Sequence, residues 1–220
     1  PPPTRLASPW SLLACATSAT RERSKMKRPL LASLVVLALA AACGQPAKQD
    51  SDAEFMSRLT TLCGQAFEGK IVSDDSEDDE WRTERIVMHV RDCSPQEVRI
   101  PLHVGDDRSR VWVLHNDGPH LALHHAHTHE DGSPDAITWY GGAGNDQASA
   151  SRMGFPADDA TKALFDSEGI PQSKDNTWAI EVRPSDNLFA YEMKRPKRFF
   201  RIEFDTSQPV APPPAPWGSE

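Results

Sequence analysis

A chain of 220 residues has room for one ordinary domain with tails. With 38% hydrophobic and 25% charged residues, its composition is that of a globular protein and excludes a membrane protein with several spanning helices. The net charge of -8 argues against nucleic acid as a partner, because binding to a duplex depends largely on neutralised phosphates.

The first 42 residues predict an export signal ahead of the folded domain. Residues 1–25 show no apolar periodicity, and we interpret them as an upstream segment that precedes the natural start at Met26. Lys27 and Arg28 then precede the apolar and small residues Leu30–Ala42, which is the order of regions in a signal peptide. This run is too short to span a bilayer, which takes about 20 residues. We therefore expect residues 26–42 to be a signal peptide.

The end of this segment resembles the lipobox of bacterial lipoproteins, in which an aliphatic residue and two small residues precede a cysteine. Here Ala40, Ala41 and Ala42 precede Cys43, with Leu39 one place earlier than in that motif. The resemblance implies that the mature chain begins at an acylated Cys43 and is carried to the outer membrane, facing the periplasm. Stable anchoring takes more than one acyl chain. Ordinary secretion with a cleaved peptide is the alternative.

Charge and cysteine content fit an exported protein. Counted from Cys43, the chain has 18 Lys and Arg against 31 Asp and Glu, a net charge of -13. Anionic lipid headgroups repel such a surface, so we expect the membrane to be contacted through the lipid anchor. Cys63 and Cys93 form the remaining pair, and an even pair in an oxidising compartment predicts a disulfide. Two buried free thiols are the alternative.

The mature part divides into a tether, a domain and a tail. Residues 43–53 are small and polar, as in a flexible tether, and residues 54–207 carry the pattern of a folded β-domain. Residues 208–220 are rich in proline and favour an extended tail, which we expect to lie on the domain with Trp217 as a clip. Apolar spacing predicts short helices over Glu54–Leu62 and Pro156–Phe165.

In the rest of the domain, apolar residues recur at every second position, which predicts about ten short strands. Their regular spacing argues for a mainly β fold, a single antiparallel barrel or sandwich with one or two short helices. The strands are expected over Ala66–Val72, Glu84–Val90, Val98–Val104, Arg110–His115, Leu121–His129, Ala136–Tyr140, Ala148–Phe155, Trp178–Arg183, Leu188–Met193 and Phe199–Phe204.

Two further resemblances concern the domain itself. Leu62–Gly69 resembles the opening of calycin-type barrels, where a helix precedes a first strand that bears glycine. Leu121–Tyr140 and Lys194–Trp217 resemble uncharacterised secreted bacterial lipoproteins, a likeness that implies no activity.

Clustered histidines are the least expected feature of the chain. All eight lie between His89 and His129, and period two places His125, His127 and His129 on one strand face with His124 on the other. Imidazoles on one face suit zinc or another late transition metal, with Glu130 and Asp131 as further ligands. The alternative is a strand whose imidazoles face solvent or a lumen and bond to nearby carboxylates.

The sequence favours binding over catalysis. It has no G-x-S-x-G elbow and no H-E-x-x-H motif. We expect an envelope lipoprotein whose domain binds a small ligand or an envelope protein through a barrel mouth near residues 125–135. A metal-dependent hydrolase that uses the three histidines is the second hypothesis, and a structural role is the third. The acidic residues 74–80 are expected to form a solvated hairpin loop, and the basic residues 194–198 a hairpin tip.

Overall fold

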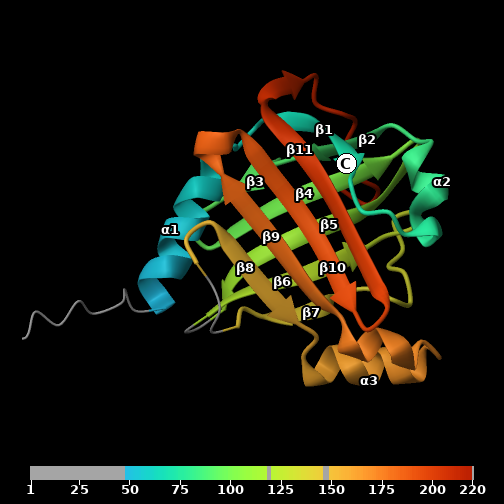
Figure 1. Ribbon diagram of the computed structural model, residues 1–220. Helices are drawn as coiled ribbons and strands as arrows, with labels where there is room; N and C mark the ends of the chain where they lie inside the picture. Colours follow the sequence, from blue (N-terminus) through green and yellow to red (C-terminus); the bar gives the residue numbers. More distant parts are fainter. Residues whose placement is uncertain (1–47, 118–119, 146–148, 220) are drawn as a thin grey trace, which may run out of the picture. The chain divides into compact units, whose positions relative to one another are not determined.

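The computed structural model describes residues 48–117, 120–145 and 149–219, all within one compact unit (Figure 1). The expected signal peptide and Cys43 lie outside the described residues. The helices are α1 (Lys48–Thr60), α2 (Asp79–Arg82) and α3 (Asp159–Ser167). The strands are β1 (Ala66–Ile71), β2 (Ile86–His89), β3 (Asp92–Cys93), β4 (Glu97–Val104), β5 (Asp107–Asp117), β6 (His120–His127), β7 (Tyr140–Ala143), β8 (Arg152–Pro156), β9 (Thr177–Arg183), β10 (Leu188–Arg195) and β11 (Arg198–Val210).

These strands form one antiparallel sheet that is nearly closed into a barrel. The strand order is β7-β6-β5-β4-β2-β1-β11-β10-β9-β8, with the short β3 paired to β4. The two ends of this order also meet, because Asn145 N–H donates to the Gly154 carbonyl at 2.9 Å and Asp158 N–H donates to the Gly141 carbonyl at 3.0 Å. The prediction of a single antiparallel β-domain is therefore confirmed, in its barrel form.

One strand begins later than predicted. The segment Ala136–Tyr140 is a loop up to its last residue, and β7 includes Gly141 and Gly142. A side chain at Gly141 would overlap the Leu123 carbonyl, and one at Gly142 would overlap the Pro156 carbonyl. The chain closes the barrel where the absence of Cβ lets backbones approach, so the two glycines belong to the strand.

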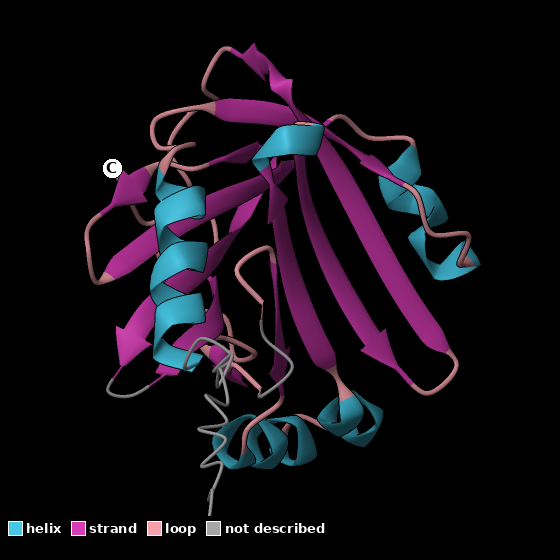
Figure 2. Cartoon of the chain, turned by 60° about the vertical axis from the view of Figure 1, so that its left-hand side comes forward, coloured by secondary structure: helices cyan, strands magenta, loops and turns pink. Residues whose placement is uncertain are grey.

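Helix α1 covers one end of the barrel. Phe55 and Leu59 on this helix are fully buried in the main core, and the Leu121 N–H at the start of β6 donates to Asp52 Oδ2 at 3.1 Å. Figures 1 and 2 show α2 and α3 well apart from this helix. The helix begins at Lys48, inside the segment expected to be the tether. No helix in the described part of the chain is long and apolar enough to cross a membrane.

The predicted disulfide between Cys63 and Cys93 is confirmed, with a Cα–Cα distance of 6.3 Å. It ties the turn that follows α1 to strand β3. Cross-linking residues 30 positions apart lowers the entropy of the unfolded chain. For such a loop we expect a contribution of about 3 to 4 kcal/mol to stability.

Most residues of the acidic segment 74–80 are exposed, as predicted, but the segment is not a hairpin loop. Residues 76–78 form a 3-10 turn that leads into α2. Arg198, from the hairpin between β10 and β11, pairs with Asp75 at 3.2 Å and Glu77 at 3.1 Å, and bonds to Asp78 with both terminal nitrogens. The basic hairpin tip thus neutralises part of the acidic segment and lets it fold against the barrel.

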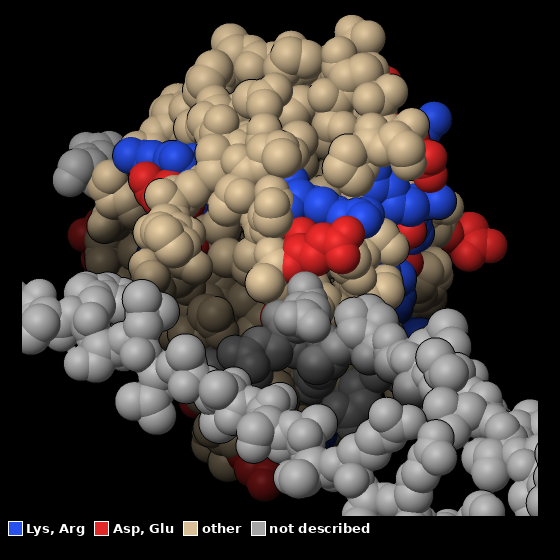
Figure 3. Space-filling model, turned by 90° about the vertical axis from the view of Figure 1, so that its left-hand side faces the viewer, with Lys and Arg blue, Asp and Glu red and all other residues tan. Residues whose placement is uncertain are grey.

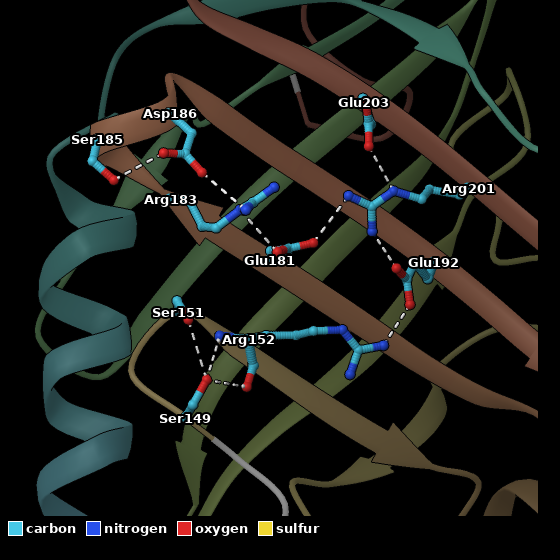
Figure 4. Close-up of polar contacts among 10 residues, drawn as sticks. All are labelled: Ser149, Ser151, Arg152, Glu181, Arg183, Ser185, Asp186, Glu192, Arg201 and Glu203. Carbon is cyan, nitrogen blue, oxygen red and sulfur yellow. Dashed lines mark hydrogen bonds and ion pairs between the residues drawn. The ribbon is translucent and has the colours of Figure 1, made fainter.

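A second ion network covers the outer face of β8 to β11 (Figure 4). The Arg201 side chain is 15% exposed and contacts three carboxylates, Glu181 at 2.9 Å, Glu203 at 2.7 Å, and Glu192, which lies opposite it in the strand register. Acidic and basic side chains also lie next to each other on the face drawn in Figure 3. Acidic and basic side chains are therefore interspersed in this network and on the face that Figure 3 draws.

The proline-rich tail lies on the domain, as predicted. Strand β11 continues to Val210, beyond the expected domain end. Further on, Arg108 Nη1 donates to the Ala215 carbonyl at 3.3 Å, and the Trp217 N–H donates to the Arg108 carbonyl at 3.2 Å. These bonds hold the tail against the start of β5.

Candidate functional site: a cavity in the barrel mouth

A cavity of about 380 Å³ lies inside the barrel, bordered by α2 and α3 rather than α1. It runs from exposed residues at the rim, such as Glu77, to buried side chains at its floor, such as His125. Its walls combine aromatic, aliphatic and polar side chains. The aromatic residues of the lining are Trp81, Trp112, Tyr140, Phe165, Trp178, Tyr191 and Phe200.

Strand β6 supplies two histidines to this cavity. Leu121 and Leu123 of β6 belong to the barrel core, and His125 and His127 follow on the same face and line the cavity. This alternation was predicted from the sequence and is confirmed. His124 lies on the opposite face, where its Nδ1 is 2.8 Å from Nε2 of His115 on β5.

His125 is almost completely buried and makes two hydrogen bonds. Its Nδ1 lies 3.1 Å from the Tyr140 carbonyl, which only accepts, so Nδ1 carries the proton. Its Nε2 therefore accepts a hydrogen bond from the Tyr191 hydroxyl at 2.7 Å. Burial lowers the pKa of His125 to about 3, so the imidazole is neutral at neutral pH.

The other polar groups at the floor are also uncharged. His127 Nε2 lies 3.2 Å from the Tyr140 hydroxyl, and burial, together with the nearby Arg110 charge, lowers the pKa of His127 to about 4. Burial raises the pKa of both Tyr140 and Tyr191 well above the usual value, so both phenols keep their protons. The floor thus offers neutral hydrogen-bonding groups between aromatic rings.

Each charged residue of the lining has a partner of opposite charge within the chain. Arg110 pairs with Asp107, and its guanidinium lies 4.9 Å from the centre of the Trp81 ring. Arg198 pairs with Glu77 and Asp78, which are the two acids of the lining. Every charged side chain of the lining is therefore engaged in an ion pair, and the two acids share one arginine.

Asn176 differs from these satisfied groups. It lies at the junction between the 3-10 turn at residues 171–175 and β9, where the Ala157 N–H donates to its carbonyl at 3.0 Å. Asn176 is 7% exposed, and its Oδ1 is buried without a hydrogen-bond partner. Among the described residues of the lining, it is the one such side-chain atom.

The structure does not bring the five residues of the expected metal site together. His125 and His127 face the cavity and approach tyrosine hydroxyls, whereas His129, Glu130 and Asp131 follow the end of β6 and are exposed. Asp131 Oδ1 accepts the Ser133 N–H at 2.9 Å and shapes the turn. Within residues 48–117, 120–145 and 149–219, no three His, Cys, Asp or Glu side chains are grouped so as to hold a metal ion.

Four residues of the site were not singled out from the sequence: Arg110, Tyr140, Asn176 and Tyr191. A signal for the two tyrosines was present, because they are the only tyrosines of the chain and both lie at strand positions of the predicted pattern. No local signal marks Asn176, whose importance comes from its position in the folded chain.

Comparison with protein-family models, with curated proteins and with solved structures found no match to this chain.

Proposed function

We propose that the barrel binds a small, mainly apolar molecule in the cavity at its mouth. The observation that carries this proposal is a cavity of about 380 Å³ that has aromatic rings in its walls, neutral hydrogen-bonding groups at its floor and ion-paired residues in its lining. Binding sites for small molecules have this size and composition, and the mouths of β-barrels are common places for them. Most buried aromatic side chains in a barrel complete a packed core, whereas these rings border open space.

A neutral fluorescent probe tests this function. We expect 1-aminoanthracene, a flat aromatic amine, to bind the protein with a rise in its fluorescence. Ile137→Trp replaces an aliphatic side chain of the lining with a bulky indole ring that takes up space in the cavity. It should weaken probe binding about tenfold or more, because overfilling a packed site costs about 1 to 3 kcal/mol.

Val72→Trp is the matched control. Val72 is 46% exposed and does not line the cavity. A tryptophan at this position should therefore leave probe affinity unchanged. Equal affinity for the wild type and both variants would show that the probe does not use the cavity. No binding to the wild type would contradict the proposed function.

The proposal includes attachment to the cell envelope through lipid on Cys43, with the domain facing the periplasm. The signal-like residues 26–42 and the disulfide support it, since disulfides persist mainly in exported proteins. We expect the full chain, expressed in bacteria with radiolabelled palmitate, to carry label in the membrane fraction, and Cys43→Ala to carry none. The Cys63→Ser/Cys93→Ser double variant should keep its label, and an unlabelled wild type would contradict the anchor.

A further inference from the structure

We propose that His115 and His124 form a site for a late transition-metal ion on the outer face of the barrel, and that the site favours copper(II). The two histidines lie on the neighbouring strands β5 and β6. Leu114 and Leu123, which precede them in the chain, point into the core, so both imidazoles lie on the outer face. The site is separate from the cavity, and the proposal does not depend on the proposed function.

The two ring nitrogens that would bind the ion already lie close together. His115 Nε2 is 2.8 Å from His124 Nδ1, because the two residues are diagonal neighbours in the strand register. Two nitrogens bound at a right angle, each about 2.0 Å from one ion, are also about 2.8 Å apart. The strands therefore hold the imidazoles at the spacing of neighbouring positions in a square-planar site, a geometry typical of copper(II) and nickel(II). Copper(II) is the more strongly bound of the two.

The ion would replace the hydrogen bond between the two imidazoles. In that bond one ring nitrogen donates and the other accepts, whereas a metal ion needs a lone pair from each. With the ion bound, each neutral ring holds its one proton on the far nitrogen, which is Nδ1 of His115 and Nε2 of His124. Small turns of the rings in their own planes aim both lone pairs at the ion. Water fills its other positions, since no third ligand is grouped with the pair among the described residues.

Asp158 places a negative charge beside the pair. Its Oδ2 lies 4.0 Å from His124 Nε2, the nitrogen on the far side of the ring from His115. Its Oδ1 accepts the Thr161 N–H at 2.7 Å as the N-cap of α3, which fixes the carboxylate. No Lys or Arg of the described residues forms an ion pair with Asp158. A carboxylate near the far nitrogen of a metal-binding histidine orients the ring and raises its basicity, so Asp158 favours a bound cation.

Trp139 restrains both imidazoles from one side. Its ring centre is 5.1 Å from that of His124, with the planes 9° apart, and 6.0 Å from that of His115, with the planes 21° apart. Its φ of 57° lies in the left-handed region, which is uncommon for a residue other than glycine and often marks a functional site. Trp139 is 50% exposed, so the stack lies at the surface, where an ion arrives from solvent. Stacking fixes the planes of the rings and still permits turning within them.

A copper(II) titration of untagged protein, first freed of metal with a chelator, tests the proposal. Isothermal titration calorimetry at neutral pH should detect copper(II) binding, and electron paramagnetic resonance should show coupling of the ion to two imidazole nitrogens. His115→Gln and His124→Gln should each weaken binding about tenfold or more and leave one coupled nitrogen. Asp158→Asn keeps an oxygen for the helix cap and removes the charge, so it should weaken binding less and keep both nitrogens.

The double variant His120→Gln/His129→Gln is the matched control. Both of these histidines are exposed and lie outside the pair, so copper(II) affinity and the two-nitrogen coupling should be unchanged. Loss of the coupling in this control, with no loss in the His115 and His124 variants, would overturn the proposal. A wild type that binds no copper(II) would do the same.

Fluorescence gives a second readout that does not depend on the folding of the histidine variants. Bound copper(II) quenches the emission of a nearby indole, so titration should quench the wild type. Trp139→Phe keeps an aromatic ring over the pair and should lose most of this quenching while it still binds copper(II). Quenching that is the same in Trp139→Phe and the wild type would place the ion elsewhere and overturn the site.

Discussion

Arg201→Met is expected to lower the free energy of unfolding by about 2 kcal/mol, because it removes a guanidinium shared by three carboxylates and leaves Glu181 and Glu192 with one arginine each, Arg183 and Arg152. The Arg201 side chain bonds to Glu181, Glu192 and Glu203, and the first two are only 15% and 12% exposed (Figure 4). Water cannot fully solvate these acids once the guanidinium is gone. Urea unfolding at neutral pH measures the change.

Arg58→Met provides the matched control. Arg58 pairs with Glu54 one helical turn away at 2.7 Å, but both side chains are more exposed. Such a helix pair contributes about 0.3 to 0.5 kcal/mol. If the two Arg→Met variants lose equal stability, the network on the outer face is no more than a set of surface pairs. Adding Glu203→Gln to Arg201→Met should restore part of the loss, since Glu203 pairs with Arg201 and, within the described residues, with no second arginine.

The second large effect is a loss of stability in mild acid. Unfolded histidine titrates near pH 6.5, whereas burial holds the pKa of His125 at about 3 and that of His127 at about 4. As pH falls below 6.5, the unfolded chain takes up protons that the folded protein does not, so folding is disfavoured. Each of the two histidines should lower the free energy of unfolding by about 2 kcal/mol between pH 7.5 and pH 5. The decline should end only as pH approaches the folded pKa values.

Histidine variants assign this pH dependence to the cavity floor. His125→Gln keeps a donor and an acceptor but does not titrate, so it should remove about 2 kcal/mol of the change between pH 7.5 and pH 5. The exposed His129 offers a control, because His129→Gln should leave the slope unchanged. Burial also lowers the pKa of His89 and His103, so part of the slope should persist in His125→Gln. If the free energy of unfolding of His125→Gln falls with pH as steeply as that of the wild type, His125 is not buried in its neutral form.

Local pattern predicted most elements of this fold, but not the short β3 and α2. Alternation along residues 121–127 predicted which histidines share a face, because a strand turns successive side chains to opposite sides whatever its neighbours are. The pairing of Cys63 with Cys93 followed from the number of cysteines and from the expectation that the chain is exported. The choice between barrel and sandwich needed the structure, since it depends on whether the first and last strands of the order meet.

The errors came from contacts between distant parts of the chain. The acidic residues 74–80 were expected to form a hairpin loop, but residues 76–78 form a 3-10 turn that leads into α2, and Arg198, more than 100 positions away, pairs with Asp78. Gly141 and Gly142 are typical of a turn, yet they lie in a strand because the closing strands leave no space for Cβ. The partners of His125, from β7 and β10, were equally out of reach of a local pattern.

The most direct test of the binding site is a crystal structure of the protein with indole. The proposed function predicts indole in the barrel cavity, in contact with aromatic lining residues such as Trp178 and Phe200. Indole bound only on the outer surface, or a cavity that stays free of indole at saturating concentration, would contradict the account.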